Sequence, residues 1–154
     1  MPSFRTTRRV AFTPRQMFDL VADVEKYPEF LPLCEALVVR KRERAGDKEV
    51  LIADMTVGYQ AIRESFTSRV SLDPAKLAVQ AGSVPDHPSG PFRHLENRWA
   101  FVEAPGGCQV DFSISYEFKS ALMQMLVGGL FDRAFRRYAE AFEARAHAIY
   151  GAKD

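Results

Sequence analysis

Hydrophobic and polar residues alternate with a period of two through the middle of the chain, from about residue 33 to residue 118. The alternation is clearest from Cys108 to Phe118, where every second residue is apolar and each residue between is polar. Successive side chains of a strand point to opposite faces, so this pattern predicts antiparallel strands with one buried and one solvated face. Strands are predicted at 36–44, 49–57, 59–70, 75–81, 92–103 and 108–118.

Helical signals precede these strands. A β-rich segment at 3–10 predicts a first strand, and Thr13 then offers an N-cap with Pro14 at the first helical position. Pro28 and Pro32 interrupt the chain soon afterwards, so a second, short helix is expected to end near residue 30.

One long helix is predicted after the strands, from the N-cap Ser120 to about residue 150, where Gly151 ends it. Its second half is amphipathic, whereas 121–131 is apolar around almost the whole circumference and must be buried or face something apolar. The pair Gly128-Gly129 lets a ligand lie against the backbone, or lets the helix kink and open, or lets a strand or the proline-bearing segment cross closely. The predicted α+β order is one strand, two short helices, six strands and one long helix.

Composition narrows the class of protein. With 154 residues and 47% hydrophobic residues, a single domain at 1–154 is expected. The formal net charge of +1 argues against a nucleic-acid binder that acts through bulk charge, and no DNA partner is expected. Two distant cysteines without metal-ligand spacing suit a reducing compartment. No apolar run is long enough to span a bilayer, so we expect a cytoplasmic protein that could lie on the inner membrane.

Few residues are candidates for chemistry. The three histidines are scattered, and the chain has no HExxH, G-x-S-x-G or phosphate-loop motif, so no catalytic residue and no metal site are expected. Glu64 falls among the apolar positions of its predicted strand, between Ile62 and Phe66. It either points into a cavity and bonds a ligand, or turns outward, or is paired by Arg63 or Arg69.

Five segments together resemble START-like coenzyme Q-binding proteins of the polyketide cyclase-like (SRPBCC) superfamily. They are Tyr27–Cys34, Phe66–Val70, Pro91–Phe101, Cys108–Phe118 and Ala141–Gly151. The resemblance covers nearly the whole chain. The close bacterial relatives in this family include a ribosome-association toxin with the same motifs. No mitochondrial presequence is evident, so a bacterial member is expected.

The resemblance implies a helix-grip fold, in which a seven-stranded antiparallel sheet wraps around the C-terminal helix. It also implies that the ligand is ubiquinone, carried in support of respiratory electron transport, with no cofactor. We expect the polyprenyl tail to lie between one face of the helix and the sheet, with a proline-rich mouth and one polar contact. The expected ligand-binding residues are Leu122, Met125, Leu126 and Gly129 on the helix; Phe66, Trp99, Phe112 and Ile114 on the sheet; Tyr27, Pro28, Phe30 and Pro32 at the mouth; and Glu64.

Two other functions stay open at this point. A ribosome-binding protein that blocks subunit association would use the basic hairpin at Arg40–Arg44, although acidic neighbours weaken the case for RNA. A polyketide cyclase or dehydratase-like enzyme would need a polar residue deep in the cavity, for which Glu64 is the candidate. Arg5, Arg8 and Arg9 either help the protein to meet an anionic membrane or form a solvated strand face.

Overall fold

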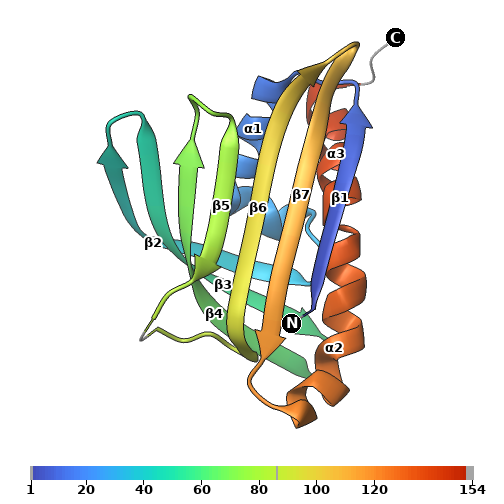
Figure 1. Cartoon of the computed structure of the whole chain (residues 1–154). Coiled ribbons are helices and arrows are strands. Elements are labelled where there is room, and N and C mark those ends of the chain that lie inside the picture. The colour runs from blue at the N-terminus through green and yellow to red at the C-terminus, as the bar shows by residue number, and fades with distance from the viewer. Residues whose placement is uncertain (1, 86, 152–154) are drawn as a thin grey trace.

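The computed structural model describes residues 2–85 and 87–151, so residues 1, 86 and 152–154 of the predicted 1–154 domain lie outside the described residues. The strands and helices follow in the predicted order, except that the C-terminal helix is divided (Figure 1). They are β1 (Ser3–Val10), α1 (Pro14–Ala22), the 3-10 helix η1 (Val24–Glu29), β2 (Cys34–Ala45), β3 (Lys48–Tyr59), β4 (Ile62–Asp73), β5 (Ala78–Ser83), β6 (Phe92–Ala104), β7 (Gly107–Phe118), α2 (Ala121–Arg136) and α3 (Tyr138–Tyr150).

In the described residues, seven strands form one antiparallel sheet in the order β1-β7-β6-β5-β4-β3-β2. The sheet curls around the C-terminal helices, as Figure 1 shows. Two register shifts in β2, at Cys34/Ala36 and Val39/Lys41, bend this edge strand. The alternation in β7 is confirmed, because its apolar residues are all buried and those between them are partly exposed. The predicted helix-grip fold is therefore confirmed.

The N-terminal helices close one end of the sheet. Thr13 and Gln16 form a capping box at the start of α1, with Pro14 in its first turn. Helix α1 buries Met17, Phe18 and Val21 and packs against β6, β7 and α3. The short second helix is η1, a 3-10 helix that packs against β2.

The C-terminal helix differs from the prediction, because it is divided into α2 and α3 at Arg137. The backbone N–H of Arg137 donates to the carbonyl of Ala134 at 3.0 Å, which tightens the last turn of α2. The atoms found closest to Gly128 and Gly129 belong to side chains of α2 itself and not to a crossing segment. The break at Arg137 also lies away from the glycine pair. The three atoms nearest to a Cβ at Gly128 would belong to the side chain of Gln124, and a Cβ at Gly129 would lie 3.4 Å from Arg133 Nη1.

Aromatic rings fill the space between the sheet and the two C-terminal helices. The ring centroids of Phe92 and Phe131 lie 5.0 Å apart, and those of Trp99 and Phe142 lie 4.9 Å apart. Such edge-to-face pairs add directional packing to the burial of large apolar surfaces. Within the part of the chain that the structure describes, no helix is both long and apolar enough to cross a membrane.

Candidate ligand-binding cavity

A cavity of about 80 Å³ lies between the concave face of the sheet, α3 and η1. Its walls are almost entirely apolar and rich in aromatic rings. Residues of the sheet form the largest part of the wall, among them Ala53, Met55, Phe66, Val70, Leu95 and Trp99. The helices add Phe135, Tyr138 and Phe142, and η1 with the segment after it adds Val24, Tyr27 and Leu31.

Few polar groups face this space, and some of them are already bonded. Asn97 donates to the carbonyl of Ser113 at 3.0 Å and accepts from Trp99 Nε1 at 2.9 Å. The hydroxyl of Tyr27 donates to the carbonyl of Val21. Among the described residues, no hydrogen bond joins the hydroxyl of Tyr138 to a partner. Because burial raises the pKa of Tyr138, this hydroxyl remains a neutral donor inside an apolar cavity.

The two cysteines are free and buried. Burial raises the pKa of Cys34 to about 12 and that of Cys108 to about 11. At neutral pH both therefore stay thiols, whereas the thiolate is the nucleophilic form. In residues 2–85 and 87–151, no group of His, Cys, Asp and Glu side chains is arranged to hold a metal ion.

The structure brings together part of the set of residues predicted to contact a ligand. Phe112 is fully buried behind the cavity, with its ring centroid 4.6 Å from that of Trp99. Four predicted residues from separate elements lie on the cavity wall: Tyr27, Phe66, Trp99 and Ile114. That they contact a ligand stays a prediction.

Of the four predicted mouth residues, Tyr27 alone lies on the cavity wall, and Phe30 packs against Phe142 of α3. Pro28, Phe30 and Pro32 are all half-buried and lie outside the wall. The guanidinium of Arg145 stands 5.1 Å from the centre of the Phe30 ring and pairs with Glu29 at 2.6 Å. These contacts close the cavity on the side of η1.

The residues predicted on the first half of the helix lie outside the cavity, so the expected place of a ligand tail is corrected. The side chains of Leu122, Met125 and Leu126 are 58%, 75% and 63% exposed, and Gly129 is exposed as well. The reason is that α2 turns the opposite side toward the sheet, with Val127, Phe131 and Phe135 buried. Because apolar residues surround the first half of this helix, the sequence does not indicate which of its faces packs against the sheet.

Glu64 is also placed outside the cavity. It shares the concave face of β4 with Phe66, because β3 and β4 pair without a register shift. It lies nearer the start of the strand, is half-buried, and takes no part in the wall. Arg63 pairs with Glu35 at 2.7 Å and not with Glu64.

Sequence reasoning missed three wall residues on the helices, namely Phe135, Tyr138 and Phe142. Their spacing of three and four predicts an ordinary amphipathic helix face. A face that packs against a core and a face that lines a cavity have the same spacing of apolar residues. The Tyr hydroxyl was the one available hint, because a buried Tyr normally needs a partner.

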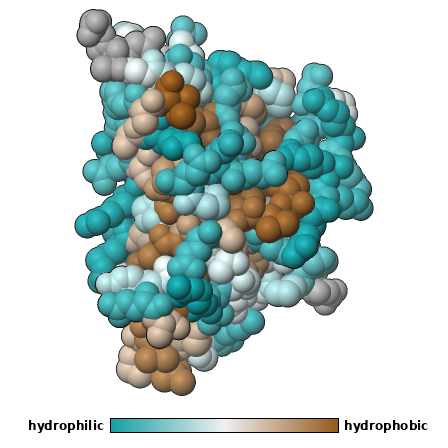
Figure 2. Space-filling model, turned by 180° about the vertical axis from the view of Figure 1, so that it is seen from behind, coloured by the Kyte–Doolittle hydropathy of each residue, from teal (hydrophilic) through white to brown (hydrophobic). Residues whose placement is uncertain are grey.

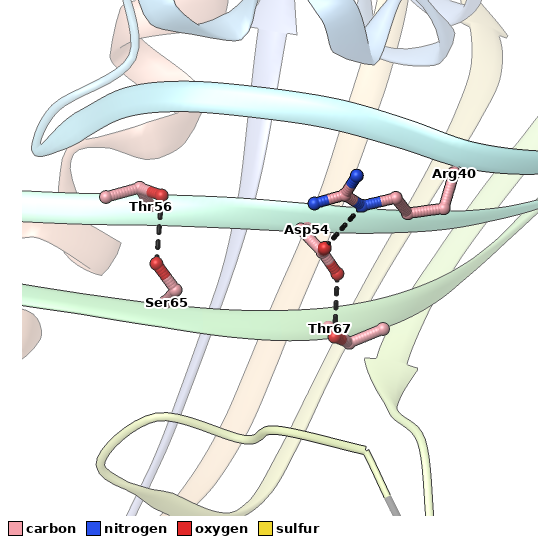
Figure 3. A network of polar contacts seen from close by, with 5 residues as sticks. All are labelled: Arg40, Asp54, Thr56, Ser65 and Thr67. Carbon is pink, nitrogen blue, oxygen red and sulfur yellow. Dashed lines mark hydrogen bonds and ion pairs between the residues drawn. The ribbon is translucent and has the colours of Figure 1, made fainter.

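A polar network on β2, β3 and β4 is drawn in Figure 3, and it lies on the face of the sheet opposite to the wall residues Met55 and Phe66. Asp54 accepts hydrogen bonds from Thr67 at 2.7 Å and from Arg40 at 2.7 Å, and Thr56 and Ser65 bond at 2.9 Å. The hydrogen bond from Thr67, followed by that from Arg40, lowers the pKa of Asp54. The network links β2, β3 and β4 and has a structural role.

Comparison with known proteins agrees with this architecture. Residues 10–143 match a family described as polyketide cyclase / dehydrase and lipid transport. A ribosome association toxin RatA from Rickettsia prowazekii is 29% identical over 152 residues, covering 97% of this chain and 99% of the toxin. The mitochondrial coenzyme Q-binding protein COQ10 homolog B from Xenopus laevis is 31% identical over 158 residues, covering 98% of this chain and 60% of that protein.

Solved structures share the fold. The 18 kDa protein CC1736 from Caulobacter crescentus is 32% identical, with a TM-score of 0.78 over 99% of this chain and 100% of that chain. A START superfamily protein from Mycobacterium smegmatis is 20% identical, with a TM-score of 0.75 over 96% of this chain and 98% of its own, which shows the fold alone. The family match and the START-like sheet and helices agree, and the chain belongs to the polyketide cyclase / dehydrase and lipid transport family.

Proposed function

We propose that this protein binds an isoprenoid quinone, or a lipid like it, and carries it without changing it chemically. The observation that supports this proposal is the aromatic, nearly apolar cavity between the sheet and α3. The family includes lipid transport in its description, and one relative is named as a coenzyme Q-binding protein. Burying each CH₂ of an isoprenoid tail contributes about 0.8 kcal/mol, so a few isoprene units would suffice for tight binding.

The cavity must widen to hold such a ligand. Its volume of about 80 Å³ is well below the roughly 300–1,000 Å³ typical of pockets for drug-sized ligands. The contacts that join η1 to α3 are side-chain contacts, unlike the backbone hydrogen bonds within the sheet. They include the Glu29–Arg145 ion pair and the packing of Tyr27 on Phe142, with ring centroids 5.2 Å apart. We propose that ligand entry separates η1 from α3.

The hydroxyl of Tyr138 would recognise the head of the ligand. It lies on the wall without a hydrogen-bond partner among the described residues, as does the hydroxyl of Ser68, and a quinone carbonyl oxygen is an acceptor. A donor left without a partner in an apolar site is unfavourable, so a ligand carbonyl would bind better than a hydrocarbon of equal size.

The test uses Trp99, the one tryptophan in the sequence and a wall residue. Delipidated protein is titrated with ubiquinone while its tryptophan fluorescence is recorded, and organic extracts of freshly purified protein are analysed by mass spectrometry. We expect saturable quenching and co-purified quinone. Tyr138→Phe should weaken quinone binding about tenfold, the loss of one hydrogen bond to a buried group, and leave a matched hydrocarbon unaffected. Absence of both quenching and extracted quinone would reject the proposal.

A ribosome-directed role is the second candidate, because the RatA toxin from Rickettsia prowazekii matches this chain along 99% of its length. The basic hairpin does not strengthen it. Arg42 pairs with Glu25 and with Glu49, and Lys41 pairs with Glu43, so much of its charge is balanced locally. Co-sedimentation with ribosomal subunits at low salt tests this candidate.

A cyclase or dehydratase activity has less support. Glu64, the candidate acid or base, lies outside the cavity wall. General acid–base catalysis needs the group within hydrogen-bond reach of the reacting atoms. Product analysis after incubation with an aromatic polyketide mimic would detect turnover and would contradict a purely binding role.

A further inference from the structure

An apolar stripe on the surface of α2 has no partner in the fold. It consists of Leu122, Met125 and Leu126, whose exposed fractions are 58%, 75% and 63%. Their spacing of three and four places them on one side of the helix. Figure 2 shows hydrophobic atoms gathered at the lower end of the molecule, where Figure 1 places the start of α2. A cluster of three large exposed apolar residues marks an interaction site.

Basic residues border this stripe along the helix. Lys119 precedes it and Arg133 follows it, and both are exposed. The sequence from 119 to 131 contains no acidic residue. The ion pairs within residues 2–85 and 87–151 include neither Lys119 nor Arg133, whereas the neighbouring Arg136 is paired with Asp132 at 3.0 Å.

The geometry of Arg133 brings its charge toward the stripe. Its Nη1 atom lies 3.4 Å from the position that a Cβ on Gly129 would occupy, so the guanidinium folds back along the helix over this glycine. With a rise of 1.5 Å per residue, the charge lies only about 5 Å along the axis from Leu126. An arginine beside the apolar face of an interfacial helix can lay its stem along the apolar surface while its guanidinium reaches the phosphates.

We propose that this face of α2 is a membrane-docking surface, which lies on anionic phospholipid with its apolar stripe among the acyl chains and Lys119 and Arg133 at the phosphates. A second copy of the chain is a poorer occupant, since three side chains fall short of the roughly 800 Å² per partner that a standard interface buries. RNA is poorer still, because exposed aliphatic side chains do not contact phosphates. The surface lies outside the cavity, so the proposal does not depend on the ligand.

The test measures sedimentation of the full chain with vesicles of phosphatidylcholine, with and without phosphatidylglycerol. The variant L122Q/M125Q/L126Q keeps residues with good helix propensity. We expect it to bind anionic vesicles at least about 100-fold more weakly than the unaltered protein. Arg133→Gln should reduce the preference for anionic over neutral vesicles several-fold, and added salt should reduce it too.

A matched control replaces two other exposed apolar residues, Val102 at 51% and Ile149 at 53%, by Gln. This control should bind vesicles within about twofold of the unaltered protein, and each variant should retain its melting temperature and its quinone quenching. If quinone quenches the tryptophan fluorescence of neither the unaltered protein nor its variants, while vesicle binding persists, the carrier function is rejected and the docking surface is still supported.

Other results would overturn the proposal. They are absence of vesicle binding, equal binding by the triple variant, or equal loss in the control. Concentration-dependent dimerisation that the triple variant abolishes would assign the stripe to a second copy. If the unaltered protein sediments with ribosomes but not with vesicles, and the triple variant alone loses ribosome binding, the stripe would be assigned to a ribosomal partner.

Discussion

Filling the cavity should stabilise the protein and impair ligand binding at the same time. Ala53, on β3, is 2% exposed and lies on the cavity wall. Ala53→Leu adds three carbon atoms at this point without adding a polar group. The same substitution at Ala100, which lies on the outer face of β6, is the matched control.

The size of the effect follows from the cavity volume. Empty volume in a protein core costs about 24 cal/mol per Å³, and the cavity measures about 80 Å³. Complete filling would therefore recover about 1.9 kcal/mol, reduced by any strain from imperfect fit. A gain of about 1–2 kcal/mol in the free energy of unfolding corresponds to a rise of about 3–6 °C in Tm for a chain of this length.

Urea denaturation of delipidated protein and fluorescence titration through Trp99 measure the two effects. We expect Ala53→Leu to raise stability by the stated amount and to lower quinone affinity at least tenfold. Ala100→Leu should leave quinone affinity unchanged. If Ala53→Leu binds quinone as tightly as the unaltered protein, the ligand does not use this cavity. If Ala53→Leu destabilises the protein by several kcal/mol, the shape of the cavity does not fit a leucine side chain at this position.

Three further results are expected. Arg145→Met, which removes the ion pair with Glu29 at 2.6 Å, should speed quinone association in stopped-flow quenching with little change in Tm, because η1 is released from α3. Gly107→Ala should cost about 3 kcal/mol in urea unfolding, because the new Cβ would lie 2.0 Å from the carbonyl oxygen of Val10. The pKa of Asp54 is lowered in the folded state, so its stabilising effect is present above the unfolded pKa of about 3.9 and is lost as pH falls through the lower folded value. Asp54→Asn should therefore destabilise the protein at pH 7 and progressively less in acid.

Each of these expectations has its own contrary outcome. Lys26→Met, which removes a weaker contact to Glu29 at 3.7 Å, should leave quinone association unchanged, and equal acceleration would deny a specific role for Arg145. Gly46→Ala meets no atom within 4 Å, and its cost should stay near 1 kcal/mol because only its positive φ is strained. A stability difference for Asp54→Asn that stays constant down to pH 2 would contradict a lowered pKa of Asp54 in the folded state.

The sheet could be predicted from the sequence because alternation with a period of two is a direct consequence of strand geometry. The clearest discrepancy is β5, predicted at 75–81 and observed at Ala78–Ser83. The carboxylate of Asp73 accepts from the backbone N–H of Lys76 at 3.2 Å, and Leu77 has a positive φ of 51°. These local bonds and backbone angles make 74–77 a turn, although its residues suit a strand.

The cavity was harder to predict than the fold. Apolar residues that pack a core and those that surround a space follow the same pattern, so Phe135 and Phe142 could not be distinguished from core residues. Leu122 and Met125 were expected at the ligand because they are apolar, but the sequence does not show which side of α2 faces the sheet. The division of the C-terminal helix at Arg137 carries no glycine or proline signal.

The pairing of β1 with β7 has a consequence for how the chain folds. Ser3 pairs with Ser115 and Val10 with Cys108, so the first strand made during synthesis finds its partner only after the last one has been made. Closing so long a loop is slow, because its entropy cost precedes the contacts that offset it. Until then β7 has an open edge, which can pair with strands of other chains. The nascent protein should therefore be most prone to aggregation just before β1 docks, and weakening the β1–β7 ladder should lengthen that interval.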